Sequence, residues 1–310
     1  MADTRVKYVD IAKGIGILAV VAGHSLQNGS FPLRLIYSFH MPLFFFLAGM
    51  CYNSGKYTFV TLLRKRARQL LVPLVLFSVI LSLLRIPILQ YPAYFSWLGL
   101  FPFSLWFVFI LFITELVGFF IVKQTLFLSI LIGGLSVILY YFDIRLPYSL
   151  SCLPAAVMFY GLGYKWKSHK FSLMHIKNGG GNCLIESGLA LIVVGYSYFC
   201  PVYLDMCSNV MPLISVGIAL CGISIVIACS RQFNDNKFVR LLVFLGRNTF
   251  VIMAVHQFFM YISNVYVKPI LYNGFIEIAL YKIAQQVIMW SGVLITIWVI
   301  NNKAKWMIGK

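Results

Sequence analysis

Long apolar runs are the feature that most constrains what this chain can fold into. A helix that spans a bilayer needs about 20 mostly apolar residues, and ten stretches of the chain approach that length. These runs cover residues 9–27, 35–52, 71–90, 104–122, 125–142, 149–165, 184–200, 211–229, 248–267 and 278–300. The sequence therefore predicts an all-α integral membrane protein with about ten transmembrane helices.

The composition agrees with lipid as the main solvent of the chain. Of its 310 residues, 61% are hydrophobic and only 11% are charged, whereas about 25% of the residues of a soluble domain are charged. Side chains of this kind cannot cover a water-facing surface. We therefore expect one membrane domain over residues 1–310, without an appended soluble domain.

Positive charge predicts the orientation of the helices. The net charge is +17, and the basic residues gather in alternate loops, as the positive-inside rule expects of cytoplasmic loops. The basic side holds Arg5, Lys7, Lys56, Arg64, Lys65, Arg66, Arg68, Lys123, Lys165, Lys167, Lys170, Lys177, Arg231, Lys237, Arg240, Arg247, Lys303, Lys305 and Lys310, and the opposite side holds Arg34, Arg145 and Lys268. Both termini and the loops 53–70, 166–183 and 230–247 are predicted to be cytoplasmic. Because topology explains the charge, we expect no nucleic-acid partner.

The first helix carries three ionisable residues, Asp10, Lys13 and His24. At 100° per residue, the eleven positions from Lys13 to His24 leave these two side chains about 20° apart, and Asp10 lies about 40° from His24. Ionisable groups within a span usually face a protein interior or a watery cavity. One stripe of the helix is thus a candidate catalytic surface. In the alternative interpretation, Asp10 and Lys13 are interfacial anchors and His24 is a core histidine.

Other candidate residues lie in later helices. His40 precedes Pro42 in the second run, Glu115 follows Trp106 in the fourth, and His256 lies in the ninth. Three of them have a structural alternative: His40 as a histidine bonded to a carbonyl at a proline kink, Glu115 as a glutamate paired with a buried base, and Trp106 as a tryptophan of the interfacial belt. Three intramembrane histidines nevertheless exceed what packing usually needs.

A basic cluster precedes Pro73, which is expected to open the third helix. The cluster consists of Arg64, Lys65, Arg66 and Arg68. It is either a topology signal alone or a clamp for phosphate groups, with which guanidinium groups pair well. The cysteines and histidines show no metal-ligand spacing, so we expect no metal.

Several motifs together resemble the membrane-bound acyltransferase 3 family of bacterial O-acyltransferases. They are the segments 8–14 (YVDIAKG), 23–24 (GH), 39–49 (FHMPLFFFLAG), 70–73 (LLVP), 105–107 (LWF) and 245–249 (LGRNT), the last followed by His256. These segments span nearly the whole chain in the family's order. The length is similar to that of stand-alone, fucose 4-O-acetylase-like members.

The resemblance implies transfer of an acyl group, usually acetyl from acetyl-CoA, to a hydroxyl of a cell-surface polysaccharide or its lipid-linked precursor. It implies a bacterial inner or plasma membrane, with an acyl-CoA donor, a glycan acceptor and lipids as partners. The family's pattern of a basic residue, ten residues and a histidine falls on Lys13 and His24. Many members have arginine at the first position, and lysine lacks its bidentate fork.

The resemblance also assigns roles to the candidate residues. His24 becomes a general base or an acyl carrier, assisted by Asp10, Lys13, His40 and Glu115. The basic cluster becomes the CoA site, and Trp106 and His256 become acceptor-binding residues.

Two other classes of function remain as alternatives. One is a transporter or flippase whose histidines bind protons or substrate. The other is a scaffold without chemistry, in which His24 and His40 would be freely replaceable. A transporter moves a solute without consuming acetyl-CoA, whereas an acyltransferase labels a hydroxyl.

Overall fold

The computed structural model describes residues 6–89, 103–122, 126–168, 181–271 and 274–309, and these residues form helices joined by turns and short loops. The helices are α1 (Lys7–Ser25), α2 (Phe31–Tyr37), α3 (His40–Cys51), α4 (Phe59–Arg66), α5 (Val72–Leu89), α6 (Trp106–Ile121), α7 (Leu126–Tyr141), α8 (Leu153–Ser168), α9 (Gly181–Phe199), α10 (Leu213–Gln232), α11 (Lys237–Arg247), α12 (Thr249–Tyr266), α13 (Lys268–Leu271) and α14 (Phe275–Lys303). Of the predicted cytoplasmic residues, Arg5, Lys123, Lys170, Lys177 and Lys310 lie outside the described ranges.

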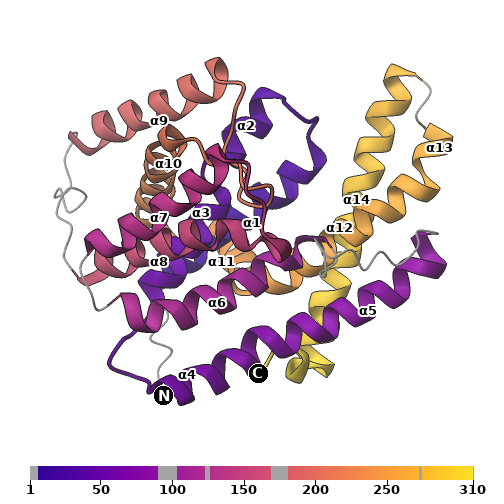
Figure 1. Ribbon diagram of the computed structural model, residues 1–310. Coiled ribbons are helices and arrows are strands. Elements are labelled where there is room, and N and C mark those ends of the chain that lie inside the picture. Colours follow the sequence, from indigo (N-terminus) through magenta and orange to yellow (C-terminus); the bar gives the residue numbers. More distant parts are fainter. Residues whose placement is uncertain (1–5, 90–102, 123–125, 169–180, 272–273, 310) are drawn as a thin grey trace.

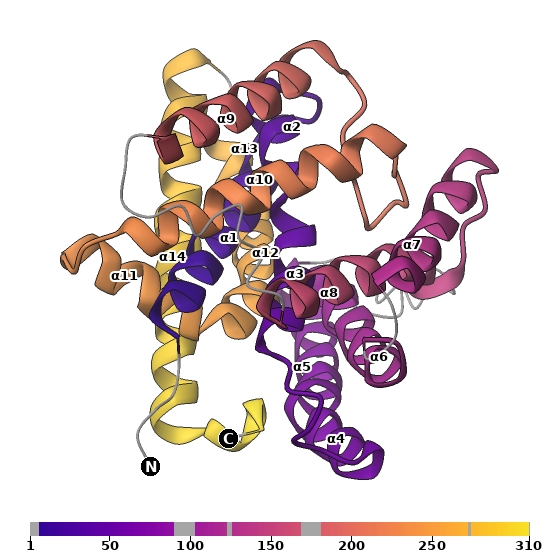
Figure 2. The same ribbon diagram turned by 90° about the vertical axis from the view of Figure 1, so that its left-hand side faces the viewer.

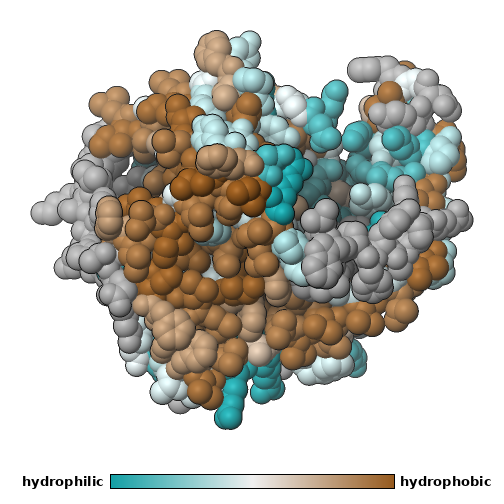
Figure 3. Space-filling model, viewed as in Figure 1, coloured by the Kyte–Doolittle hydropathy of each residue, from teal (hydrophilic) through white to brown (hydrophobic). Residues whose placement is uncertain are grey.

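Four helical segments of the described chain are long and apolar enough to cross a membrane. They are Phe31–Cys51, Phe59–Ile88, Leu213–Gln232 and Ile276–Lys303, and α11 with α12 make a fifth if this bent pair is one span. Shorter apolar helices accompany them, and every predicted run overlaps a helix. Large apolar side chains such as Leu83, Phe127 and Leu184 are exposed on the surface, and Figure 3 shows apolar side chains over most of the visible face. The chain is therefore an all-helical, multi-pass membrane protein.

The third run corrects one prediction, because Pro73 does not open its helix. The helical segment begins at Phe59 and passes through α4 into α5 without a break. Proline has no N–H to donate to the carbonyl four residues earlier, and its ring crowds that carbonyl. Here the turn Ala67–Leu71 before Pro73 is a π-helix, a widened turn that accommodates such a mismatch. The basic cluster consequently lies on a helix rather than in a loop.

The predicted loop 230–247 also contains a helix. Helix α11 meets α12 at 85°, and its apolar residues Val239, Leu242 and Leu245 are buried. Lys237, Arg240 and Arg247 interrupt its apolar residues, so no long apolar run marks α11 in the sequence. In the second run, a break at Ser38 and Phe39 separates α2 from α3.

Helix α1 lies at the centre of the fold and packs against α3, α10, α11 and α12 (Figures 1 and 2). Its crossing with α11 is close because both helices present glycine. A Cβ on Gly14 would meet the backbone of Leu242, and one on Gly246 would meet the backbone of Asp10. Small residues at such crossings let helix backbones approach within membranes. The crossing brings Asp10 and Lys13 next to the junction of α11 and α12.

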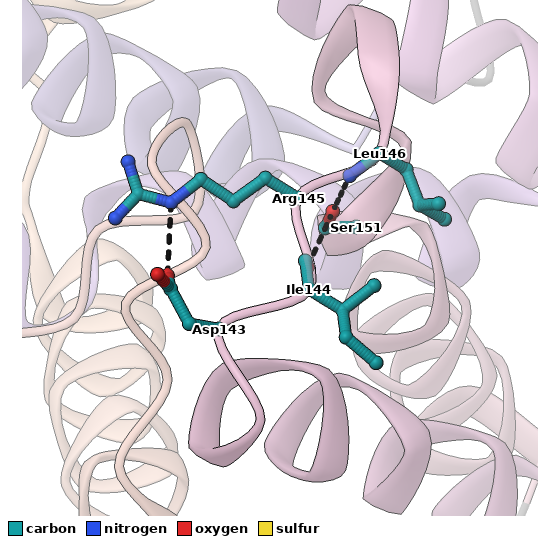
Figure 4. Close-up of polar contacts among 5 residues, drawn as sticks. All are labelled: Asp143, Ile144, Arg145, Leu146 and Ser151. Carbon is teal, nitrogen blue, oxygen red and sulfur yellow. Dashed lines mark hydrogen bonds and ion pairs between the residues drawn. The ribbon is translucent and has the colours of Figure 1, made fainter.

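Basic residues predicted to lie on the two sides of the membrane can be located in the fold. Helix α4 and the end of α14, which carry residues of the predicted cytoplasmic side, lie toward the bottom of Figures 1 and 2. On the predicted opposite side, Arg145 pairs with Asp143 at 3.0 Å (Figure 4). Arg34 there donates to the carbonyl of Cys200 at 3.3 Å. Local partners thus satisfy two of the three basic residues predicted on that side.

Candidate active site

A cavity of about 240 Å³ lies beside α1, with α3, α6 and α12 around it. Most of its wall is apolar and includes Ile17 and Met253. Its charged lining residues are Lys13 from α1, Arg66 from the end of α4 and Glu115 from α6. The structure thus brings together one residue of the predicted stripe, one of the basic cluster and the intramembrane glutamate.

Arg66 and Glu115, which both line this cavity, form an ion pair. The Glu115 side chain is only 5% exposed and that of Arg66 is 22% exposed, so the pair is held where a lone charge is costly. Arg66 also donates to Gln69 at 3.2 Å. Lys13 and Lys65 interact electrostatically with the same carboxylate. Cationic groups therefore outnumber the single acid at the charged end of the cavity.

A second polar group surrounds His24, near the other end of α1. The amide nitrogen of Gln257 lies 2.9 Å from both ring nitrogens of His24, and the Ser104 hydroxyl lies 3.4 Å from Nε2. The ring of His256 packs beside that of His24, with their centroids 5.2 Å apart. Because one ring nitrogen of a neutral histidine lacks a proton, Gln257 has an acceptor on His24 in either tautomer. We call His24, Ser104, His256 and Gln257 the histidine cluster.

The backbone determines which nitrogen of His256 carries hydrogen. Nδ1 lies 2.9 Å from the carbonyl of Ile252 and 3.0 Å from that of Met253. A carbonyl only accepts, so Nδ1 must donate, and the neutral ring then has a bare lone pair on Nε2. That Nε2 is buried without a hydrogen-bond partner among the described residues. The cluster thus contains a buried, unpaired acceptor next to the His24 ring.

The cavity and the histidine cluster lie along the same helices. His24 is seven residues beyond Ile17 on α1, and His256 is three residues beyond Met253 on α12. At 1.5 Å per residue these separations are about 10 Å and about 5 Å. The turn before α6 supplies Ser104, and α6 itself supplies Phe107 and Glu115 to the cavity. Cavity-lining residues and imidazoles therefore follow one another along α1 and α12, about two helical turns apart on α1.

Three predicted site residues neither line the cavity nor belong to the histidine cluster. Asp10 is 1% exposed, and its carboxylate accepts from Nε of Arg247 at 3.1 Å, which joins α1 to the end of α11. His40 Nδ1 lies 3.0 Å from the Ile36 carbonyl. Trp106 packs edge-on against Phe107, which lines the cavity. The predicted stripe therefore divides, with Asp10 toward α11 and Lys13 toward the cavity.

The basic cluster divides as well. Arg64 and Arg68 are exposed, whereas Arg66 reaches the cavity. Lys65 donates to the Tyr57 hydroxyl and lies over that ring, 4.5 Å from its centroid. Among the described residues, no three His, Cys, Asp or Glu side chains are placed to hold a metal ion.

The sequence reasoning did not single out Ser104, Gln257 or the pairing of Arg247 with Asp10. Gln257 directly follows His256, and Arg247 lies within the LGRNT segment. Both residues are therefore next to, or part of, motifs that the sequence had already indicated. Their partners are more than 200 residues away in sequence. No local pattern reveals a contact of that separation.

A histidine held by an amide and a hydroxyl, on the same helix as a cationic lysine that lines the cavity, has the parts that acyl transfer needs: a base for a hydroxyl and donors for a developing oxyanion. The comparison with protein families agrees. The family model described as an acyltransferase domain, that of acyltransferase 3, matches residues 6–300. No curated protein and no solved structure matches the chain. The chain therefore belongs to the acyltransferase 3 family and is a membrane acyltransferase.

Proposed function

We propose that this enzyme transfers an acetyl group from acetyl-CoA to a hydroxyl of a cell-surface polysaccharide or of its lipid-linked precursor. In this proposal the chain is one domain with ten spans and cytoplasmic termini, in a bacterial inner or plasma membrane. The membership of the acyltransferase 3 family supports an acyl donor. The charge bias of the loops supports the orientation.

The donor is proposed to bind from the cytoplasmic side. CoA is strongly anionic, and the exposed Arg64 and Arg68 lie on the same helical segment as Arg66, whose side chain lines the cavity. Guanidinium groups pair with phosphates through two parallel hydrogen bonds. The apolar wall of the cavity suits the thioester arm. This placement directs the acyl carbonyl along α1 toward His24.

His24 is proposed to take the proton of the acceptor hydroxyl. The hydroxyl oxygen then forms a bond to the acyl carbon, the carbon–sulfur bond breaks, and the proton passes from His24 to the departing thiolate. Gln257 and Ser104 hold the His24 ring or donate to the oxyanion. In a second version, His24 itself accepts the acyl group and passes it to the hydroxyl. Both versions need an unprotonated ring nitrogen on His24.

The observation that carries this proposal is the placement of the cationic cavity and the histidine cluster along the same two helices, α1 and α12. Its test is mass spectrometry of the host's surface polysaccharides with and without the gene. We expect one glycan to lose an acetyl group when the gene is absent. The wild-type gene should restore the group, and an equally expressed His24→Gln gene should not. Unchanged acetylation of every surface glycan would refute the proposal.

A further inference from the structure

A group of polar side chains lies between α12 and α14, beyond the histidine cluster. Its members are Ser25, Asn264, Tyr281, Lys282, Gln285 and Gln286, and we call it the α12–α14 cluster. Figure 3 shows polar side chains gathered toward the upper right of the face, in the region of the upper part of α14. Neither the cavity nor the proposed transfer step uses these residues.

The α12–α14 cluster is physically continuous with His24. Ser25 follows His24 in the chain, and its hydroxyl accepts from the Gln286 amide at 2.8 Å. Lys282 donates to the Ser25 carbonyl at 3.1 Å. On α12, Asn264 lies seven residues beyond Gln257, which is about 10 Å at 1.5 Å per residue. The cluster therefore begins at the catalytic helix end and extends away from the cavity.

The inner part of the cluster is a hydrogen-bonded network. Gln285 donates to the Asn264 carbonyl oxygen at 3.0 Å and to the Tyr281 hydroxyl at 2.9 Å. Tyr281 donates to the same Asn264 oxygen. Tyr281 is 3% exposed and Gln285 is 5% exposed. These bonds hold Asn264 in one orientation, with its oxygen turned into the network.

The network leaves polar groups uncommitted. Among the described residues, the Asn264 amide nitrogen and the Gln286 carbonyl oxygen make no hydrogen bond, and the Gln285 carbonyl oxygen is buried without a partner. Lys282 is exposed and uses one of its three donors in a hydrogen bond. Such a buried, unpaired acceptor is costly. Polar residues that served only to join two membrane helices would be expected to satisfy one another.

We infer that the α12–α14 cluster binds the sugar of the acceptor and positions its hydroxyl toward His24. This inference rests on the proposed function. A sugar hydroxyl both donates and accepts, which matches the mixed donors and acceptors at Asn264, Lys282 and Gln286. The donor cavity lies at the other end of α1, so the two substrates approach His24 from opposite directions. The cluster thereby selects a polyhydroxylated ring over water or lipid.

The test compares acceptor and donor dependence in purified protein in lipid nanodiscs. The donor is labelled acetyl-CoA, and the acceptor is the polysaccharide fraction extracted from a host without the gene. The variants are Lys282→Met and Gln286→Leu. Lys268→Met, at the exposed lysine of α13, is the matched control. We expect each cluster variant to raise the KM for the fraction about three- to tenfold, as loss of one hydrogen bond predicts. The KM for acetyl-CoA and its slow hydrolysis should stay unchanged.

Unchanged acceptor KM in both cluster variants, with active wild-type protein, would overturn the inference and leave the cluster as a contact between helices. Lower thermal stability with unchanged acceptor KM would overturn it as well. If wild-type protein hydrolyses acetyl-CoA but labels no part of the fraction, the proposed function fails, and the acceptor site fails with it. These outcomes separate the two claims.

Discussion

The buried ion pair between Arg66 and Glu115 gives a quantitative prediction. The Glu115 side chain is 5% exposed, so replacing Arg66 with methionine removes the ion-pair partner of a buried carboxylate and leaves it only the weaker attraction of Lys13 and Lys65. Removal of one member of a buried pair typically costs about 3–5 kcal/mol. The double variant Arg66→Met/Glu115→Met removes both charges, and such replacements are often neutral or stabilising. We therefore expect Arg66→Met alone to be strongly destabilised and the double variant to recover most of the loss.

The assay is the free energy of unfolding, measured by titrating SDS into purified protein in mixed micelles. The two single variants and the double variant form a cycle, whose coupling energy should be at least about 2 kcal/mol. A single variant within about 0.5 kcal/mol of wild type, or a double variant that costs the sum of the two singles, would refute this reasoning. If Arg66 also contacts the donor, the stable double variant should bind acetyl-CoA more weakly. Equal donor affinity would confine Arg66 to a structural role.

Three further predictions concern packing, the donor and topology. Gly246→Ala places a methyl group against the Asp10 backbone and should cost about 1–3 kcal/mol in the same titration; Gly217→Ala, where the space is open, is the control, and equal effects would contradict the close crossing. The double variant Arg64→Gln/Arg68→Gln should raise the KM for acetyl-CoA more than it lowers kcat, and the difference in KM from wild type should shrink at high salt. An unchanged KM would leave these arginines only the role of setting the membrane orientation. In protein without its seven cysteines, a cysteine at Lys56 or Lys237 should be protected from an impermeant maleimide in intact cells while one at Arg145 reacts; the reverse pattern would invert the orientation.

The sequence predicted the positions of the helices well wherever a long apolar run marks them. Each apolar run overlaps a helix because bilayer thickness and helix rise leave few alternatives. The sequence was a poorer guide to helices in segments that contain several basic residues. The basic cluster continues into the third helix because a π-turn accommodates Pro73, and α11 is helical because its apolar side faces α1. Both features depend on tertiary packing that residue periodicity does not record.

The candidate site was predictable in its residues but not in its grouping. Helical periodicity placed Asp10, Lys13 and His24 on one stripe. In the structure, however, Asp10 accepts a hydrogen bond from Arg247, whereas Lys13 lines the cavity. The sequence showed three intramembrane histidines and could not tell which of them meet. The structure places His256 beside His24 and bonds His40 to a carbonyl of its own segment. Distances between helices decide these pairings, and a single sequence does not contain them.

The most direct test of the account is acetyl transfer by purified His24→Gln protein. Glutamine retains hydrogen-bonding groups for Gln257 and Ser104 but takes up no proton near neutral pH and carries no acyl group. With insertion and thermal stability equal to wild type, the rate of labelled acetyl transfer to the host's surface polysaccharide should fall about 10²–10⁴-fold, as loss of a positioned base predicts. A stable His24→Gln protein with the wild-type rate would contradict the account and transfer the catalytic role to His40 or His256.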